Sequence, residues 1–509
     1  MRAKKALISV YNKKGVVELA KVLSEKFGYE IISTGGTFKK LAENGINCQE
    51  ISDLNEFGEL LNGRVKTLHP RVFAGILAQQ DNSEHINQLE KFSISPVDIV
   101  IVNLYPFKNN LSIDEMIELI DIGGVSLIRA AAKNFDYVAS VCSVSQYEEL
   151  VENLEQNDGI TSIDFRKKLA VEAFSHTAAY DTMISNSLSE VLLPASNNLP
   201  DVFNISLKKE YDLRYGENPH QAAAFYSNKT SFDILNGKEL SFNNINDMSA
   251  AVDIISEFPD VPAVAVIKHS TPCGVAIGND IDDAYMKAFD CDSLSAFGGI
   301  IAFNQPVTEK IAKHASSVFL EVLVAPDFSP EALELLKKKK NLRLIKLNNN
   351  LIQYRKLKKF DIKELSFGTL IQSEDRAELN KDTFKVVTEK KPTAEQVEDM
   401  VFAWKVVKHA KSNAIVVAKD KKAIGIGAGQ TSRIGAMEIA LSKVCDDLKD
   451  AVVASDGFFP AIDNIKAAAS AGITAIIQPG GSIKDKDVID EANKYKIAMI
   501  TTSIRHFKH

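Results

Sequence analysis

The stretch AVAVIKHSTPCG at residues 263–274 decides how the second half of the chain folds. Its first five residues are apolar and small or β-branched, which is typical of a fully buried strand, and the Pro and Gly that follow indicate a turn. In open α/β sheets, ligands bind at the carboxyl ends of such strands. Lys268 and His269 stand at that end, where such a pair can polarise a substrate and move a proton near neutral pH. A Lys-His pair also ends strands that have no catalytic role, so the pair alone leaves both interpretations open.

A weak internal repeat includes this stretch. Residues 263–278 predict a strand, a turn and a strand, followed by a helix from about Ile281. Residues 413–429 predict the same order, followed by a helix from about Gly435. We therefore expect two copies of one α/β unit.

Short apolar runs alternate with amphipathic segments in the first third of the chain. Strands are predicted at residues 6–10, 30–33 and 97–102, and helices at 16–26 and 37–44. This alternation indicates a mainly parallel sheet with helices on both faces.

A polar segment bounded by proline, LPASNNLP at residues 193–200, is the best linker candidate in the chain. We therefore predict one α/β domain over residues 1–195 and a second α/β region over residues 201–509.

The composition excludes several classes of protein. The 509 residues are 45% hydrophobic, which is enough for large cores, and the net charge of −7 argues against a chain that coats nucleic acid. The five cysteines are scattered and never form a C-x-x-C pair, as in proteins of a reducing cytosol without structural zinc. No run of 18 apolar residues is present to span a membrane. We expect a soluble cytoplasmic protein of more than one domain.

Three segments of the first domain are candidates for binding an anion. STGGT at 33–37 follows a predicted strand and opens a helix, where converging N–H groups favour a phosphate. NGRVKTLHPR at 62–71 gathers basic side chains, and NLYPF at 103–107 places Tyr105 at the end of a buried strand. A plain strand-to-helix turn and a solvated basic loop are the alternative interpretations of the first two segments.

A fourth segment supplies a carboxylate close to these candidates. DIGG at 121–124 precedes a predicted helix that carries Arg129 and Lys133. Asp121, Tyr105 and lysines around one phosphate pocket would suit proton transfer on a nucleotide.

The second region holds further candidate segments. RYGENPHQ at 214–221 contains turn-forming residues that should present Arg214 and Tyr215 at a surface or cleft. SDGFFP at 455–460 places two aromatic residues at a turn, either to stack on a flat heterocycle or to join the core.

A glycine-rich segment, GIGAGQTSR at 425–433, invites a dinucleotide-binding interpretation. Gln430 occupies the third glycine position of G-x-G-x-x-G, so the fingerprint fails. Close approach of the backbone to a ligand, with Arg433 as an anion partner, fits this segment better.

Zinc-dependent deamination is the main rival for the region around Lys268 and His269. That chemistry requires H-x-E followed by P-C-x-x-C. Cys273 follows a proline, but Ala276 occupies the second cysteine position and no H-x-E precedes it. We reject the zinc site and expect Cys273 to be a buried structural thiol.

Together these motifs resemble one family over nearly the whole chain: the bifunctional purine-biosynthesis enzymes that join a phosphoribosylaminoimidazolecarboxamide (AICAR) formyltransferase to an inosine monophosphate (IMP) cyclohydrolase. STGGT, GRVKTLHP, NLYPF and IDIGG…RAAAKN are similar to the cyclohydrolase half. LRYGENPHQ, KH-x-x-PCG, SAFGG, GIGAGQTSR, SDGFFP and SIRHF are similar to the formyltransferase half. The resemblance implies a methylglyoxal-synthase-like parallel-sheet domain, followed by a transformylase region of two cytidine-deaminase-like α/β subdomains without zinc.

The resemblance also implies two reactions. In the first, 10-formyltetrahydrofolate, a co-substrate, gives its formyl group to AICAR and forms FAICAR. In the second, FAICAR closes its ring with loss of water and becomes IMP. The implied enzyme needs no metal, binds no nucleic acid or membrane, and is a cytoplasmic homodimer with formyltransferase sites at the subunit interface.

Individual residues acquire expected roles from the resemblance. His269 would take the amine proton in formyl transfer, and Lys268 would stabilise negative charge or protonate the leaving folate nitrogen. Proton transfers and oxyanion stabilisation in ring closure would fall to Lys66, Tyr105, Asp121 and Lys133. The cyclohydrolase substrate would be bound by Tyr11, Asn12, Lys13, Thr34, Gly35, Gly36, Thr37, Arg64, Thr67, Val102, Asn103 and Ile122. The formyltransferase nucleotide would be bound by Arg214, Tyr215, Gly298, Glu321, Asn413, Arg433 and Arg505, and folate by Phe458, Asp463 and Asn464.

Two other functional classes remain as alternatives. The first domain could sense a metabolite without catalysis, although its complete set of proton-handling residues argues against this. The chain could be a zinc deaminase, which a finding of stoichiometric zinc would support.

Overall fold

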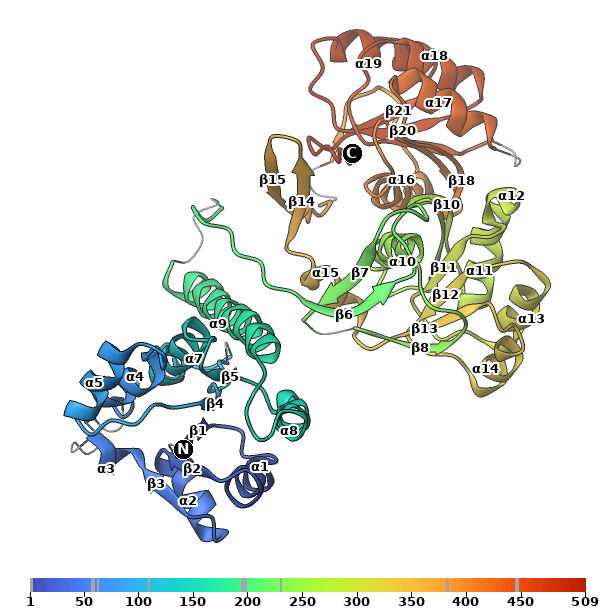
Figure 1. Cartoon of the computed structure of the whole chain (residues 1–509). Helices are drawn as coiled ribbons and strands as arrows, with labels where there is room; N and C mark the ends of the chain where they lie inside the picture. The colour runs from blue at the N-terminus through green and yellow to red at the C-terminus, as the bar shows by residue number, and fades with distance from the viewer. Residues whose placement is uncertain are drawn as a thin grey trace. The chain divides into compact units, whose positions relative to one another are not determined.

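A computed structural model describes residues 3–55, 60–61, 64–108, 110–193, 199–228, 231–380, 384–444 and 448–509. The chain divides into two compact units, residues 1–207 and 208–509, and each is described by itself (Figure 1). Asn62, Gly63 and residues 194–198 of the predicted linker lie outside the described residues.

The first unit is built on a sheet of five parallel strands in the order β3-β2-β1-β4-β5. Its strands are β1 (Lys4–Val10), β2 (Tyr29–Ser33), β3 (Cys48–Glu50), β4 (Ile99–Asn103) and β5 (Ala139–Val141). The three predicted strands are present as β1, β2 and β4. The sequence did not reveal β3 and β5, because three-residue strands are too short to show a periodic pattern.

Helices cover both faces of this sheet, as predicted. They are α1 (Val16–Lys21) with the π-helical η1 (Val22–Lys26), α2 (Gly35–Glu43), α3 (Ile51–Asn55), α4 (Pro70–Leu77), α5 (Ser83–Lys91), α6 (Ile113–Glu118), α7 (Gly123–Lys133), the 3₁₀ turn η3 (Val144–Gln146), α8 (Tyr147–Gln156) and α9 (Ile163–Leu192). In β4, Ile99 and Ile101 join the core under α1 and α8, whereas Val100 and Val102 join the core under α4 and α7. Burial on both faces explains the unbroken apolar run of this strand.

The second unit contains one mixed sheet of twelve strands, in the order β16-β21-β20-β19-β17-β18-β10-β9-β11-β12-β13-β8. Its strands are β8 (Phe232–Asn236), β9 (Ala263–Lys268), β10 (Thr271–Ile277), β11 (Ile300–Phe303), β12 (Val322–Ala325), β13 (Arg343–Leu347), β16 (Lys385–Val386), β17 (Ile415–Lys419), β18 (Lys422–Gly427), β19 (Val452–Ser455), β20 (Ala475–Gln478) and β21 (Ala498–Thr501). Two separate hairpins are formed by β6 (Lys208–Leu213) with β7 (Ala223–Ser227) and by β14 (Phe360–Leu365) with β15 (Gly368–Ser373).

The strand order confirms the internal repeat. Each half has an antiparallel hairpin, β9–β10 or β17–β18, beside three parallel strands, β11–β12–β13 or β19–β20–β21. The two halves join edge to edge where β10 pairs with β18 at Ala276 and Lys422.

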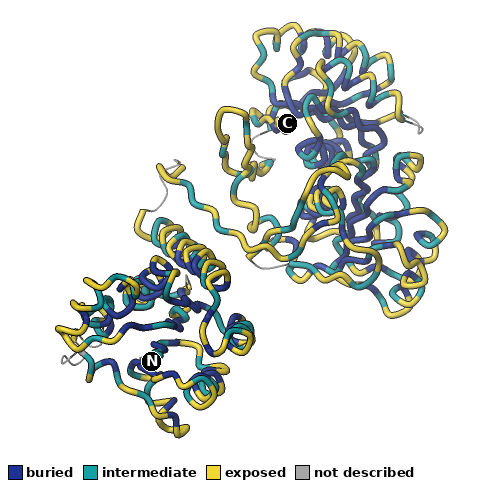
Figure 2. Tube along the Cα trace, in the orientation of Figure 1, coloured by how far each residue is buried: buried dark blue, intermediate teal, exposed yellow. Residues whose placement is uncertain are grey.

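The helices of the second unit form two layers around its sheet. One face packs on α10 (Phe242–Ile255) and α16 (Ala394–Val407), which share a core that contains the buried Trp404 and strand residues from both halves. The other face carries α11 (Ile281–Asp290), α13 (Glu309–Ser317) and α14 (Pro330–Lys337) in one half, and α17 (Arg433–Ser442), α18 (Asp463–Ser470) and α19 (Asp485–Lys494) in the other. Short α12 (Ser293–Ala296) and α15 (Leu351–Leu357) complete the unit. Figure 2 shows the sheet strands as its most continuously buried segments.

A buried ion cluster joins the residues that follow α10 and α16. Lys408 Nζ and His409 Nε2 each lie 3.2 Å from Oε1 of Glu257, and Arg355 Nη2 lies 3.6 Å from Oε2. Burial alone would raise the pKa of Glu257, but the hydrogen bond from His409 and the neighbouring positive charges lower it to about 2. The carboxylate therefore stabilises the fold above its ordinary pKa of 4.5, and this stabilisation is lost as the pH falls toward 2.

We expect Glu257→Gln to lower the free energy of unfolding of the second unit by about 3–5 kcal/mol at pH 7, because it leaves buried cations without their carboxylate. The difference from wild type should shrink as the pH falls from about 5 toward 2. Urea titration followed by the fluorescence of Trp404, the one tryptophan, measures both effects. Glu398→Gln, which removes an exposed ion pair with Lys421, is the control and should change little. A difference independent of pH would contradict the electrostatic explanation.

Within the described residues, no helix combines the length and the apolar character needed to cross a membrane.

Candidate active sites

The candidate residues of the first unit gather where its parallel strands end. Val10 of β1 pairs with Asn103 of β4, and Ile8 pairs with Ser33 of β2. The segments that follow β1, β2 and β4 therefore begin side by side at the carboxyl edge of the sheet. This is the edge at which open parallel sheets bind ligands.

The segment at 34–37 forms a polar turn bonded to the end of β1. Thr34 shares a 2.7 Å hydrogen bond with Ser9, and the Thr37 hydroxyl bonds both the N–H and the carbonyl of Val10. Lys13 Nζ donates to the Thr37 hydroxyl at 2.8 Å, and burial lowers the pKa of this lysine. Because α2 begins at Gly35, its first N–H groups and the Lys13 ammonium make this corner suitable for a phosphate.

The ends of β1 and β4 are tied together by side chains. The Asn103 side chain accepts a hydrogen bond from the Asn12 N–H at 2.8 Å and donates to the Asn12 carbonyl at 3.1 Å. Beyond them, the exposed rings of Tyr11 and Tyr105 lie 5.0 Å apart between centroids. Val102 has a buried side chain, so only its backbone can face a ligand.

The Asp121 carboxyl lies against the first turn of α7. Oδ1 accepts from the Gly124 N–H at 2.7 Å, and the Tyr180 hydroxyl accepts from the Asp121 N–H at 2.9 Å. Burial raises the pKa of Asp121, and N–H bonds from Gly124 and Tyr105 offset part of that rise. A buried carboxyl with a raised pKa, joined to the backbone of Tyr105, is a candidate for proton transfer.

Two glycines allow this close approach. A Cβ on Gly124 would lie 2.5 Å from Oδ2 of Asp121, and one on Gly123 would lie 2.5 Å from the hydroxyl oxygen of the buried Thr67. The Gly-Gly pair of the DIGG segment thus brings α7, Thr67 and Asp121 into contact. Ile122, between Asp121 and these glycines, is exposed.

For the ring closure that the sequence resemblance assigns to this unit, we expect Gly124→Ala to lower the rate about 100-fold, because the added methyl would displace the Asp121 carboxyl from its position. Formyl transfer by the same preparation serves as the internal control and should keep its rate. Both rates are measured with their own substrates supplied. Equal loss of both activities would instead indicate general damage to the protein.

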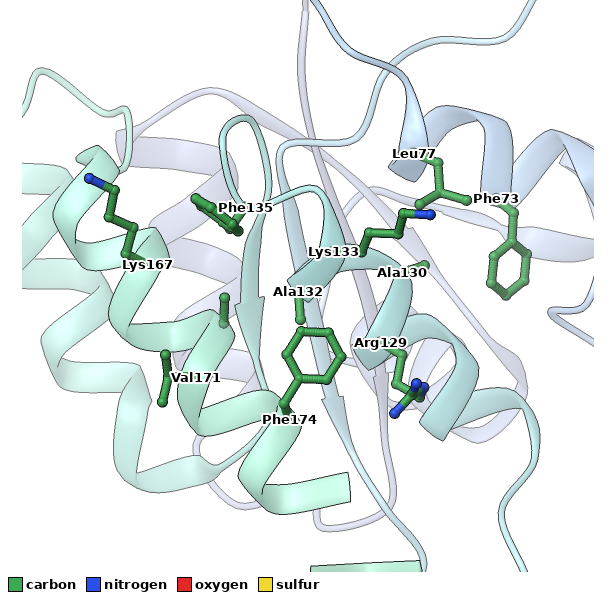
Figure 3. A pocket seen from close by; sticks show the side chains of 11 residues that line it. Phe73, Leu77, Arg129, Ala130, Ala132, Lys133, Phe135, Lys167, Val171 and Phe174 are labelled. Atoms are coloured by element: carbon green, nitrogen blue, oxygen red, sulfur yellow. The ribbon is translucent and has the colours of Figure 1, made fainter. Parts of the chain in front are cut away.

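Lys133 is not brought to Asp121 within one chain. Asp121 precedes α7 and Lys133 is its last residue, so the length of the helix, about 15 Å, separates them. Figure 3 shows Lys133 on a groove between α4, α7 and α9, beside Leu77 and Phe73. The groove has a volume of about 690 Å³ and an apolar lining, in which Phe174 packs under the Arg129 guanidinium at 5.5 Å.

The two remaining candidates of the basic loop are Arg64 and Lys66. Arg64 is exposed and forms an ion pair with Glu118 of α6. Lys66 is half-buried, directly before Thr67.

The candidates of the second unit also share one edge of their sheet. β10 pairs antiparallel with β18, and β9 pairs antiparallel with β11. The ends of β9 and β18 therefore lie beside the starts of β10, β11 and β17. Lys268, Gly298, Glu321, Asn413 and the end of β19 at Ser455 therefore lie along this edge. Three strand spacings, about 14 Å, separate β9 from β17 and divide the candidates into two groups.

The first group surrounds the turn after β9. Lys268 Nζ donates to the Phe297 carbonyl at 2.9 Å, and the His269 side chain is exposed. Gly298 follows with φ at 73°, a conformation that favours glycine, and donates to the Phe319 carbonyl at 2.8 Å. The rings of Phe297 and Phe319 are both exposed and lie 5.3 Å apart between centroids.

Glu321 also belongs to this first group and contacts α10. Its Oε2 accepts from the buried Asn244 side chain at 2.7 Å and lies 3.8 Å from Arg343. Arg214 is exposed, with its guanidinium 5.4 Å from the ring of Tyr215, in the turn that the sequence predicted. That turn contacts α10 through Asn243, which donates to the Glu217 carbonyl at 3.5 Å.

The second group centres on a buried arginine. Arg433 forms an ion pair with the fully buried Asp456 and donates to the Asn413 side chain at 2.6 Å and to Ser455 at 3.0 Å. A Cβ on Gly457 would lie 2.6 Å from Arg433 Nη2, which explains the glycine of the SDGFFP segment. The Arg433 charge is thus already balanced by a carboxylate within the chain.

Residues near the chain end and at the start of α18 flank this arginine. The Arg505 guanidinium lies 4.8 Å from the ring of Phe507. Of the two aromatic residues at the turn, Phe458 is partly exposed and Phe459 is fully buried in the core. Asn464 is fully buried, bonds Asp463 through its amide nitrogen at 2.8 Å, and leaves its carbonyl oxygen without a hydrogen-bond partner among the described residues.

The Cys273 thiol is unreactive in this environment. Burial raises the pKa of its thiol to about 11, so it is protonated at neutral pH. Among the described residues, no group of three or more His, Cys, Asp or Glu side chains is placed to hold a metal ion.

Comparison with known proteins identifies the family of this chain. The model of the AICARFT/IMPCHase bienzyme matches residues 131–443, and that of an MGS-like domain matches residues 15–126. The chain belongs to the AICARFT/IMPCHase bienzyme family. It is 50% identical to the "Bifunctional purine biosynthesis protein PurH" of Caldicellulosiruptor saccharolyticus, over 99% of this chain and 100% of that protein. It is 50% identical to the protein of the same name from Thermoanaerobacter sp., over 100% of both chains.

Family membership and the two-unit architecture together account for the motif segments in both halves. A solved structure titled "Crystal structure of ForH" is 30% identical over 37% of this chain and all of that chain, with a TM-score of 0.35.

Sequence reasoning missed the site residues on α10 and the partner of Arg433. Asn244 bonds Glu321, Asp247 bonds the turn at His269, and Asp456 pairs with Arg433. A signal was present for Asp247, because an Asp-Met pair six residues after a helix cap occurs at both 247–248 and 399–400. Asp456 is part of SDGFFP, but its burial under Arg433 depends on strand pairing far along the chain.

Proposed function

We propose that the cluster at the carboxyl edge of the first sheet and the cluster along the Lys268 edge of the second sheet are the two active sites of one purine-biosynthesis enzyme. The chain is a bifunctional AICAR formyltransferase and IMP cyclohydrolase, which performs the last two steps of IMP synthesis. The observation that carries this conclusion is 50% identity over the full length of relatives named bifunctional purine biosynthesis protein, together with the match to the AICARFT/IMPCHase bienzyme model.

We assign formyl transfer to the second unit. The AICAR amine is conjugated with its ring and carboxamide, so it is a weak nucleophile and needs a base as it attacks the formyl carbon. His269 takes the amine proton, and Lys268 stabilises the negative charge on the formyl oxygen. When the bond from carbon to the folate nitrogen breaks, that nitrogen is protonated and tetrahydrofolate leaves. The other residues proposed to bind the nucleotide are Arg214, Tyr215, Gly298, Glu321, Asn413, Arg433 and Arg505.

The folate co-substrate is assigned to Phe458, Asp463 and Asn464. The partly exposed Phe458 ring offers a face for stacking on a flat heterocycle. The buried Asn464 carbonyl that lacks a partner in the described chain supports a ligand that donates a hydrogen bond there.

Ring closure is assigned to the first unit. The carboxamide nitrogen of FAICAR attacks the formyl carbon, a carbon–nitrogen bond forms, and water leaves. Holding both groups in attack geometry supplies much of the rate, since effective molarities for such reactions reach about 10⁵ M or more. Asp121, Tyr105, Lys66 and Lys133 handle the protons and the oxyanion. The phosphate and ribose are assigned to Lys13, the turn 34–37, Arg64 and Thr67, with Tyr11, Asn12, Val102, Asn103 and Ile122 as further contacts.

We further propose that the protein is a cytoplasmic homodimer whose formyltransferase sites lie between subunits. The exposed rings of Phe297 and Phe319, which are in contact beside Lys268, support a covering surface there. In the first unit, Lys133 lies away from Asp121 on an apolar groove with Val171 exposed by 69%. A second copy of the chain bound at this groove would have Lys133 of the first copy in its active site.

The test of the function is to supply AICAR and 10-formyltetrahydrofolate to the pure protein and to follow IMP by chromatography. Formation of IMP without added metal is expected. Accumulation of FAICAR alone would contradict the assignment of ring closure, and no consumption of AICAR would contradict the assignment of formyl transfer. Light scattering of the same sample tests the dimer.

A further inference from the structure

His269 and Ser270 form a two-residue turn between β9 and β10. Lys268 pairs with Thr271 across the turn, and φ is 54° at His269 and 56° at Ser270. Two successive left-handed residues favour Asn and Gly, because a larger side chain crowds the backbone in that conformation. Neither position holds one of these residues, so contacts from outside the turn must stabilise it.

The Asp247 carboxylate on α10 makes those contacts. Oδ2 accepts from the N–H of His269 at 3.1 Å, and Oδ1 accepts from the N–H of Ser270 at 2.7 Å. The Ser270 hydroxyl also donates to Oδ1 at 3.0 Å and accepts from the Asn246 side chain at 2.8 Å. Because α10 is packed in the core through residues such as Met248, the carboxylate is held on a rigid element.

The second half of the sheet contains the same arrangement. Asp420 and Lys421 have φ of 53° and 56° in the turn between β17 and β18. The Asp399 carboxylate on α16 accepts from their N–H groups at 2.9 Å and 2.7 Å. A helix-borne aspartate that holds a hairpin turn is therefore part of the repeated unit.

The two aspartates occupy equivalent positions in their helices. Asp247 stands six residues after the N-cap Ser241, and Asp399 stands six residues after the N-cap Thr393, both in capping boxes. Only the first turn carries an imidazole. Such an aspartate can contribute to the structure of both turns. It can contribute to the chemistry only at the first turn, because only that turn contains His269.

We infer that Asp247 is a positioning residue for formyl transfer. Its carboxylate holds the backbone of His269 so that the imidazole points at the amine of the substrate, and it touches no reacting atom itself. The inference rests on the proposed role of His269 as the base of that reaction. Misplacement of a catalytic group by about 1 Å can cost about 100-fold in rate, so the hold on this turn matters for turnover.

The test compares Asp247→Asn with Asp399→Asn in the full chain. Each change keeps the shape of the side chain but points an NH₂ group at one backbone N–H, so each loses one turn hydrogen bond. We expect Asp247→Asn to lower kcat of formyl transfer about 10- to 100-fold, with KM for AICAR and for the folate within about twofold. Asp399→Asn should leave kcat within about twofold of wild type, and both variants should show a similar shift in urea midpoint.

A second substitution tests whether the effect passes through the turn. Ser270→Gly, added to Asp247→Asn, should restore much of kcat, because glycine adopts positive φ without a steric penalty. Lys421→Gly, added to Asp399→Asn, should leave kcat unchanged. If Asp247→Asn does not fold, Asp247→Ser, which keeps one hydroxyl acceptor, replaces it in the same comparison.

Equal losses of kcat in Asp247→Asn and Asp399→Asn would overturn the inference, as would an unchanged kcat in Asp247→Asn. Loss of affinity without loss of kcat would assign Asp247 to binding instead and would also overturn it. Failure of the underlying assignment looks different: formyl transfer would then survive replacement of His269 itself.

Discussion

Replacement of His269 by alanine is expected to abolish formyl transfer while the protein continues to convert supplied FAICAR to IMP. Loss of a general base costs about 10²- to 10⁴-fold in rate, and His269 has no second imidazole beside it in its turn. Ring closure should persist, because its proposed residues belong to the other compact unit. The two rates are measured separately, with AICAR and 10-formyltetrahydrofolate in one assay and FAICAR alone in the other.

The conformation of His269 requires a matched control. Alanine is disfavoured at its φ of 54°, so His269→Ala removes the imidazole and also destabilises the turn. His269→Asn keeps a residue that tolerates this conformation and should be equally inactive. Asp420→Ala makes the same backbone change at the equivalent turn, and formyl transfer should survive it. Inactivity of Asp420→Ala would show that the backbone of such a turn, and not the imidazole, accounts for the loss. Loss of both reactions in a well-folded His269→Asn would show that the two-site division is wrong.

Replacement of Lys133 by alanine should have the reverse effect. Ring closure is expected to fall about 10²- to 10⁴-fold, because a proton-transfer group is lost, and formyl transfer should continue so that FAICAR accumulates. Lys167→Ala removes a second ammonium from the same groove and should leave ring closure intact. If Lys167→Ala were as damaging as Lys133→Ala, the charge of the groove and not Lys133 itself would be responsible.

Mixed dimers test which copy Lys133 serves. Copies with Asp121→Asn should be inactive in ring closure when assembled alone, as should copies with Lys133→Ala. If Lys133 acts in the site of the second copy, random mixing restores about a quarter of wild-type ring closure, since half the dimers are mixed and each has one complete site. If Lys133 acts within its own chain, mixing restores nothing, and the proposed arrangement is wrong.

The elements that the sequence predicted best are those with strong local patterns. The apolar runs of β4 and β9 are present as strands, as expected, because burial on both faces leaves a direct trace in residue order. Strands such as β3, β5 and β16 left no such trace, because they are two or three residues long and obtain their stability from neighbours in the sheet.

Some residues that look equivalent in the sequence differ in burial. Phe458 and Phe459 are adjacent in a single turn, yet one is partly exposed beside the proposed folate site and the other is in the core. Arg433, which was predicted as an anion partner from its place in a glycine-rich segment, is buried in an ion pair with Asp456 of the same chain. These outcomes depend on which strand lies beside which, and no local pattern contains that information.

The sequence by itself determined the chemistry that each segment offers: the glycine turn of STGGT, the Lys-His pair at the end of β9, the broken zinc signature and the order of motifs shared with one enzyme family. Only the tertiary structure decided which of these groups meet. In the folded chain the Asp121 carboxyl bonds the backbone of Tyr105, and Lys133 lies away from both. The Asp247 carboxylate bonds the turn at His269. The physical reason is that periodicity, caps and turns act over a few residues, whereas strand order and helix direction are set by burying both faces of a sheet at once.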